Sequence, residues 1–160
     1  MTDSTNTRTA GRERVEKHRS LRVLFVDDEE PLRELMRSEL PRLGHEVTVC
    51  QDGRTALKVL DKTTFDAAIL DLRMPGMTGI EVLEYLKKLS PDTEAVVMTG
   101  HASMETAIEA VRLGAFDYIT KPCKLAEIDG MLRRITDRRE LKNKNIALTA
   151  RVRPPRGPAT

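Results

Sequence analysis

Tryptophan is absent from the chain, and its only aromatic residues are two tyrosines and three phenylalanines among 160 residues. Base-stacking surfaces for single-stranded nucleic acid are built from aromatic side chains, so their scarcity argues against that class of protein. No stretch approaches the roughly 18 consecutive apolar residues of a membrane span, and no secretory leader opens the sequence. We therefore expect a cytoplasmic protein that does not associate with membranes.

Cysteine is also scarce. Cys50 and Cys123 are far apart and form no Cys-x-x-Cys motif. Free thiols are therefore expected, rather than a disulfide framework or a zinc site. A chain of 160 residues is long enough to bury one domain core without such cross-links.

The small net charge of +2 conceals two segments of opposite sign. Residues 21–120 hold 11 Lys/Arg and 18 Asp/Glu, a net charge of −7, whereas residues 121–160 hold 11 and 4, a net charge of +7. Such asymmetry bears on the choice of partner rather than on the fold. No helix-turn-helix, zinc-finger or basic-zipper pattern accompanies the basic segment, so direct DNA binding is not expected and a solvated helix face is favoured.

Five short segments are predicted to be strands, and three of them are continuous apolar runs. They are residues 23–26, 47–50, 67–70, 95–98 and 117–120. Each strand is followed by a segment whose apolar residues recur at helical spacing. Because parallel strands need helical crossovers, this alternation predicts a doubly wound α/β fold with a parallel sheet covered on both faces.

The pattern divides the chain into three parts. Residues 1–20 are polar and lack periodicity, so we predict a flexible N-terminal arm. Residues 21–137 form the predicted domain. Beyond them the apolar stripe ends, since Arg139 and Lys142 occupy its next positions, and residues 138–160 are predicted to be a basic, disordered tail.

Polar and charged residues follow the predicted strands where each one ends. Asp27 and Asp28 follow the first strand, Asp71 the third, Thr99 the fourth and Lys121 the fifth. The carboxyl ends of parallel strands share one edge of the sheet, so these side chains are expected to converge there. Three crowded carboxylates suit Mg²⁺, and the hydroxyl and ammonium groups would stabilise a phosphoryl group. No glycine-rich loop is present, which argues against a nucleotide.

These motifs together resemble the receiver domain of two-component response regulators over roughly residues 21–137. The resemblance rests on Asp27-Asp28, Asp71 with Met74-Pro75-Gly76, Thr99-Gly100-His101, and Tyr118 with Lys121-Pro122. Residues 98–103 and 114–122 are most similar to the nitrogen-regulation (NtrC-like) branch. The resemblance implies a flavodoxin-like (βα)5 fold with strand order 2-1-3-4-5.

The resemblance also implies a role for each site residue. Asp71 would accept a phosphoryl group from a sensor histidine kinase or a phosphotransfer protein. Mg²⁺ would be held by Asp27, Asp28, Asp71 and the backbone carbonyl of Arg73.

Two further residues would form the switch, in which Tyr118 turns inward as Thr99 is drawn to the phosphate. Thr99 would hydrogen-bond that phosphate and Lys121 would pair with it. The Lys121–Pro122 peptide bond is expected to be cis.

The resulting hypothesis is a phosphorylation-dependent signalling switch that is not an enzyme beyond its own phosphorylation and dephosphorylation. Its output would be a homodimer or an unknown downstream protein, since no output domain is recognised in this chain. The alternative is a truncated N-terminal receiver of a σ54-dependent transcription activator.

Two other classes share parts of this pattern. A flavodoxin-like flavin protein would bind its phosphate after the first strand, where Asp27-Asp28-Glu29 would repel it. An aspartyl-phosphate phosphatase would carry its nucleophile after the first strand, whereas here the lone acceptor follows the third.

Overall fold

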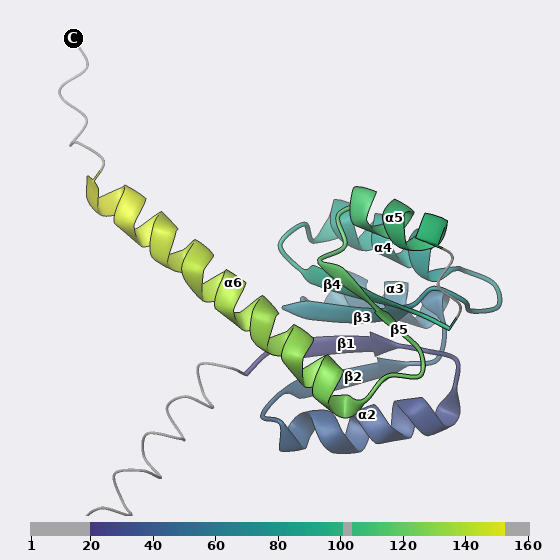
Figure 1. Ribbon diagram of the computed structural model, residues 1–160. Helices are drawn as coiled ribbons and strands as arrows, with labels where there is room; N and C mark the ends of the chain where they lie inside the picture. The colour runs from purple at the N-terminus through teal and green to yellow at the C-terminus, as the bar shows by residue number, and fades with distance from the viewer. Residues whose placement is uncertain (1–19, 101–103, 153–160) are drawn as a thin grey trace, which may run out of the picture.

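A computed structural model describes residues 20–100 and 104–152 of the chain. Its elements are β1 (Arg22–Val26), α2 (Glu30–Arg42), β2 (Glu46–Cys50), α3 (Gly53–Lys62), β3 (Ala67–Asp71), α4 (Gly79–Leu89), β4 (Glu94–Thr99), α5 (Met104–Arg112), β5 (Asp117–Thr120) and α6 (Leu125–Val152). The strands form one parallel sheet in the order β2-β1-β3-β4-β5 (Figure 1). The predicted α/β class and strand order are confirmed, and each strand lies within one residue of its predicted bounds.

The two faces of the sheet carry separate apolar cores because successive strand residues point to opposite sides. In β1, Val23 and Phe25 pack with α2 and α6, whereas Leu24 and Val26 pack with α3, α4 and α5. All four of these side chains are fully buried. A strand buried on both faces is a continuous apolar run, which explains why the sequence revealed the strands so clearly.

Local signals fix where several helices begin. The Asp52 carboxylate accepts a hydrogen bond from the Thr55 N–H at 2.8 Å and so caps α3. Thr78 caps α4 in the same way, through the Glu81 N–H at 3.3 Å. Ser103, a residue type that often caps helices, precedes α5 but lies outside the described residues.

The last helix corrects one prediction. α6 is 28 residues long and continues to Val152, so the expectation of a disordered tail was wrong for residues 138–152. The apolar stripe does end as predicted, but ion pairs to the body replace it, and neither glycine nor proline interrupts residues 131–152. Figure 1 shows this helix passing the sheet and projecting beyond it. The predicted arm up to residue 19 and tail residues 153–160 lie outside the described residues.

The hydropathy of the helices also bears on the expectation about membranes. Over residues 20–100 and 104–152, no helix combines the length and apolar character needed to cross a bilayer.

Candidate functional site at the carboxyl ends of the strands

The predicted carboxylates converge at one edge of the sheet. β1 and β3 are neighbours and Val26 is paired with Leu70, so Asp27 and Asp71 emerge side by side one residue further on. Together with Asp28 they place three carboxylate oxygens within 4.8 Å of one another. Asp27 and Asp71 are buried and Asp28 is exposed, so the cluster opens to solvent on one side.

Lys121 supplies a cation to this cluster from the end of β5. Its Nζ atom lies 2.6 Å from Asp27 Oδ2 and 3.3 Å from Asp71 Oδ2, and it also lies 3.7 Å from the exposed carboxylate of Glu29. The Lys121–Pro122 peptide bond is cis, as the resemblance implies. The ammonium group therefore stands between the two buried carboxylates, where the charge of an incoming anion would be partly neutralised.

The environment of Asp71 makes its charged form costly. Burial raises the pKa of Asp71 to about 6, and the nearby charge of Asp27 adds to the effect. Two contacts oppose this rise, namely the Arg73 N–H, which donates to Asp71 Oδ1 at 3.1 Å, and the Lys121 ammonium. Burial also lowers the pKa of Lys121, but Asp27 and Asp71 outweigh it, so that pKa lies above its ordinary value.

Thr99 and Tyr118 lie on the two neighbouring strands β4 and β5. Thr99 is buried at the end of β4, and its carbonyl oxygen accepts a hydrogen bond from the Lys121 N–H at 2.8 Å. Tyr118 is paired with Val97 in the sheet register, and its side chain is 38% exposed. The structure thus places Thr99 beside the cluster and Tyr118 in an outward position. His101, two residues after Thr99 in sequence, lies outside the described residues.

Arg33 is a site residue that the sequence reasoning missed. Its Nη1 atom donates to the carbonyl oxygen of Asp27 at 3.0 Å, while the Glu29 N–H donates to Asp27 Oδ1 at 2.8 Å. Both contacts hold the loop that carries Asp27 and Asp28. A signal was available, because a cation near a helix N-terminus opposes the helix dipole and needs another reason to be there.

Gly79 was also missed as a site residue. A β-carbon at this position would lie 2.2 Å from the carbonyl oxygen of Asp71 and 2.8 Å from the α-carbon of Leu72. Contacts this short do not occur, so any larger residue would displace the backbone of Asp71. Glycine at the first turn of α4 therefore permits the close return of the loop that follows β3.

The donor set fits a hard divalent cation. Three carboxylates with clustered oxygens, two of them buried, repel one another unless a positive charge is shared among them. Oxygen ligands of this kind, with an open side for water or a phosphate oxygen, are those that Mg²⁺ accepts. The single positive charge of Lys121 pairs with Asp27 and Asp71 and neutralises only part of the cluster. The exposed carboxylate of Asp28 remains available to a metal ion.

A doubly wound parallel sheet with a carboxylate cluster and a lysine at the carboxyl ends of its strands defines an aspartate-based phospho-acceptor class. The family model for the response regulator receiver domain matches residues 23–133. The chain belongs to the response regulator receiver family.

The individual proteins that it resembles include response regulators of the NtrC-like branch. It is 37% identical over 134 residues to a putative NtrX-like response regulator from Rickettsia felis, covering 82% of this chain and 28% of the relative. It is 36% identical over 121 residues to the regulatory protein AtoC from Escherichia coli, covering 76% of this chain and 26% of AtoC. The crystal structure of NtrX from Brucella abortus superposes with a TM-score of 0.76 at 32% identity, covering 83% of this chain and 31% of NtrX. The chain thus spans less than a third of the length of these proteins.

Proposed function

We propose that Asp71 accepts a phosphoryl group from the phosphohistidine of a sensor histidine kinase or a phosphotransfer protein. The observation that carries the proposal is the position of this carboxylate. Asp71 is 3% exposed at the carboxyl end of the central strand β3, and its Oδ2 atom lies 3.3 Å from the Lys121 ammonium. A buried carboxylate with a cation beside it, next to a solvent-open cluster, suits an acceptor for a charged group.

In the proposed transfer, a carboxylate oxygen of Asp71 attacks the phosphorus of the phosphohistidine. The new P–O bond forms as the P–N bond breaks, and the imidazole leaves with the bonding electron pair. The Lys121 ammonium pairs with the phosphoryl oxygens, and the Thr99 hydroxyl donates a hydrogen bond to one of them. Because the pKa of Asp71 is about 6, the nucleophilic carboxylate form predominates above that pH.

Asp27, Asp28, Asp71 and the backbone carbonyl of Arg73 are the residues that would hold Mg²⁺. When bound, the ion supplies positive charge to the carboxylates and to the phosphoryl oxygens. Arg33 and Glu29 support this set by fixing the loop around Asp27.

The proposed output surface lies on α5, β5 and α6. Phosphorylation would draw Thr99 toward the phosphate and let Tyr118 turn inward, which changes the surface around β5. A groove of about 400 Å³ borders Tyr118 and is lined on the α6 side by Met131 and Arg134. We propose that a second copy of the chain, or an unknown downstream protein, binds there when Asp71 is phosphorylated.

One part of this surface is less available for a partner than its sequence indicates. By their sequence alone, Arg112, Asp117, Arg133 and Arg134 would offer mixed charges to a second copy of the chain. In the structure Arg134 pairs with Asp117 at 2.8 Å, and Arg133 pairs with Asp129 at 3.1 Å, both within the chain. A two-fold contact would therefore have to exchange these pairs or use Arg112.

The acceptor role is tested by intact-mass spectrometry after incubation with acetyl phosphate and Mg²⁺. Wild type should gain the mass of one phosphoryl group and Asp71→Asn should not, because an amide cannot form the mixed anhydride. Labelling of Asp71→Asn at the wild-type level would place the acceptor elsewhere. Sedimentation velocity with and without beryllofluoride, on wild type and Arg112→Glu, tests the dimer separately.

The alternative, that this chain is the receiver portion of a σ54-dependent activator, assigns Asp71 the same role. Similarity to AtoC and to NtrX-like proteins, which are longer than this chain, supports it. This alternative differs only in that an output domain elsewhere in a longer protein would respond to the phosphorylation.

A further inference from the structure

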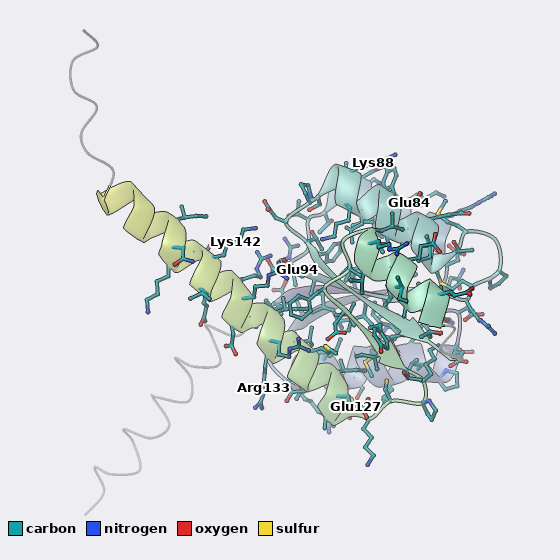
Figure 2. The ribbon with its side chains drawn as sticks, turned by 45° about the horizontal axis from the view of Figure 1, so that its top comes forward. Glu84, Lys88, Glu94, Glu127, Arg133 and Lys142 are labelled. Carbon is teal, nitrogen blue, oxygen red and sulfur yellow. The ribbon has the colours of Figure 1, made fainter. Side chains whose placement is uncertain are left out.

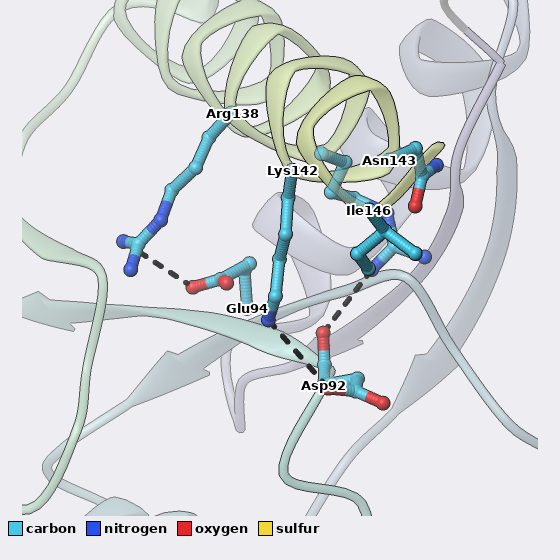
Figure 3. Close-up of a pocket in the computed structure, with 7 residues that line it drawn as sticks. Asp92, Glu94, Arg138, Lys142, Asn143 and Ile146 are labelled. Carbon is cyan, nitrogen blue, oxygen red and sulfur yellow. Dashed lines mark hydrogen bonds and ion pairs between the residues drawn. The ribbon is translucent and has the colours of Figure 1, made fainter. Parts of the chain in front are cut away.

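The edge of the sheet opposite the carboxylate cluster carries a second group of charges. The acidic members stand in the loops before β3 and β4 or at the first residue of β4, and the basic members lie along α6. They are Asp66, Asp92 and Glu94 on the body, and Arg138, Arg139 and Lys142 on α6. Figure 2 shows Glu94 and Lys142 where α6 passes the sheet, and Figure 3 shows the Arg138–Glu94 and Lys142–Asp92 pairs at close range. We call these six residues the α6 clamp.

Arg139 is the central member of the clamp. Its Nη2 atom lies 2.9 Å from Asp66 Oδ1, and its Nη1 atom donates to the carbonyl oxygens of Asp92 at 3.1 Å and Asp66 at 3.4 Å. The other carboxylate oxygen of Asp66 accepts the Arg22 N–H at 2.8 Å. One guanidinium group thus ties α6 to both loops, and through Asp66 to the start of β1. Planar guanidinium groups with several donors suit such multiple contacts.

Two longer ion pairs flank Arg139. Arg138 lies 3.8 Å from Glu94, and Lys142 lies 3.7 Å from Asp92. Together with Asn143 and Ile146, the clamp residues other than Asp66 line a pocket of about 150 Å³ between α6 and the body (Figure 3). Ion pairs of this length with an exposed cation contribute little individually, so the shorter, partly buried contacts of Arg139 are expected to dominate.

Apolar packing does not explain why α6 continues past this point. Its fully buried apolar residues end at Ile135, and further along Leu141 and Ile146 are each 61% exposed. Helix propensity alone gives the segment from residue 137 to 152 little stability, because most helical stability in proteins comes from tertiary contacts. The polar contacts of the clamp are therefore the interactions available to anchor it among the residues described.

We propose that Arg139, flanked by Arg138 and Lys142, clamps α6 to the amino-terminal edge of the sheet and so fixes the direction in which residues 140–152 leave the domain. The clamp makes the helix a rigid rod rather than a flexible connection. This role does not depend on phosphorylation of Asp71.

A second contact joins the same rod to β5. Arg134 pairs with Asp117 Oδ2 at 2.8 Å, and Asp117 Oδ1 accepts the Tyr118 N–H at 2.8 Å. Arg134 and Arg138 also lie over the Phe116 ring, at 5.2 and 5.5 Å from its centroid. Arg134 thus holds the rod beside Tyr118, the proposed switch residue, and the clamp holds it at the edge of the sheet opposite the carboxylate cluster. A shift of β5 would therefore tilt α6 and move its exposed end, because the clamp prevents the helix from rotating freely about its contact with β5.

Amide hydrogen exchange on the full chain tests the clamp. Arg139→Gln removes the charge and most of the donors, whereas Lys144→Gln makes the same charge change on the exposed surface of the same helix. We expect amides 140–147 to exchange about tenfold faster in Arg139→Gln than in wild type, which corresponds to about 1.4 kcal/mol. Lys144→Gln should match wild type. Equal exchange in the two variants would overturn the proposal.

A charge exchange separates the clamp from a general loss of stability. Arg138→Glu and Glu94→Arg each place like charges opposite one another and should speed exchange in residues 140–147, and the double variant, which makes the charges opposite again, should restore protection. The distance between spin labels at residues 88 and 145 then reports direction. A narrow distribution in wild type that broadens in Arg139→Gln supports the rod, whereas equally broad distributions in both proteins would refute it. Urea unfolding of each variant identifies any that has lost the fold, and Arg139→Lys serves as a replacement that keeps the charge.

Discussion

The ammonium of Lys121 lies closer to Asp27 than to the proposed acceptor: 2.6 Å separate Nζ from Asp27 Oδ2, against 3.3 Å from Asp71 Oδ2. Asp27 is fully buried, so in the metal-free protein Lys121 acts chiefly as its counter-ion. Lys121 therefore competes with any metal ion for the charge of Asp27. A metal ion that neutralises Asp27 frees the lysine to pair with a phosphoryl group on Asp71.

The first prediction concerns Lys121→Met. In EDTA this variant should lose about 3 kcal/mol of unfolding free energy, because removing one partner leaves buried carboxylates unpaired. Mg²⁺ should restore more stability to the variant than it adds to wild type, since the competing cation is gone. Urea unfolding in EDTA and in Mg²⁺ measures both. Equal gains from Mg²⁺ in the two proteins would show that Lys121 and the metal ion do not share Asp27.

The second prediction concerns the pH dependence of stability in EDTA. The pKa of Asp71 rises to about 6 on folding, so between about pH 4 and pH 6 the folded state binds more protons than the unfolded state. The contribution of Asp71 to stability is therefore lost as the pH rises through that window. Asp71→Asn should be more stable than wild type at pH 7.5, by at most about 3 kcal/mol. The difference should vanish near pH 4, and a constant difference across the range would contradict the assignment.

The fold and the site residues were predictable because their signals are local. Strands buried on both faces are continuous apolar runs, and Asp27, Asp71 and Thr99 each stand at the end of one, whereas Lys121 follows the shorter strand β5. Parallel pairing then brings those ends together without further information. The arrangement of the carboxylates thus followed from the order of strands along the chain.

The missed features depend on contacts between distant segments. The helical course of residues 138–152 depends on Arg139 meeting Asp66 and Asp92, which lie 73 and 47 residues away in sequence. A charged residue that interrupts an apolar stripe indicates the end of a helix as long as its ion-pair partner elsewhere in the sequence is not known. The close approach at Gly79 likewise appears only when the loop after β3 is folded back.

The third prediction compares two glycines. Gly79→Ala should destabilise the protein by more than about 2 kcal/mol and reduce phosphoryl transfer, because its β-carbon would push against the Asp71 carbonyl. Gly130→Ala is the matched control, since nothing lies within 4 Å of its β-carbon position in α6. That substitution should stabilise the protein by up to about 1 kcal/mol through helix propensity. Thermal unfolding and labelling with acetyl phosphate measure the two effects, and similar behaviour of both variants would count against steric restriction at Gly79.

The fourth prediction concerns His45, which is buried and accepts the Leu21 N–H through Nδ1 at 3.0 Å. Burial lowers the pKa of His45, although the charge of Asp129 opposes this. The folded state then binds fewer protons than the unfolded state just below pH 6.5, so this contribution to stability is lost as the pH falls through that value. His45→Asn should therefore flatten the decline in unfolding free energy between pH 7.5 and pH 5.5. A decline as steep as that of wild type would exclude His45 as its source.

The last prediction assigns a positioning role to Arg33, whose guanidinium holds the carbonyl of Asp27 at 3.0 Å. Without it the loop that carries Asp27 and Asp28 keeps only the Glu29 N–H contact on this side, so the carboxylates would spend less time in a metal-binding arrangement. Arg33→Met should weaken Mg²⁺ binding several-fold by isothermal titration, although one cation near the acidic cluster has been removed. Simple electrostatics gives the opposite sign, since losing a positive charge would strengthen metal binding.

Arg37→Met is the control for Arg33→Met, because Arg37 lies one turn further along α2 and pairs with the exposed Glu34. It should leave metal affinity unchanged or slightly raised. If Arg33→Met binds Mg²⁺ as tightly as Arg37→Met does, Arg33 acts only through its charge and the positioning role is excluded.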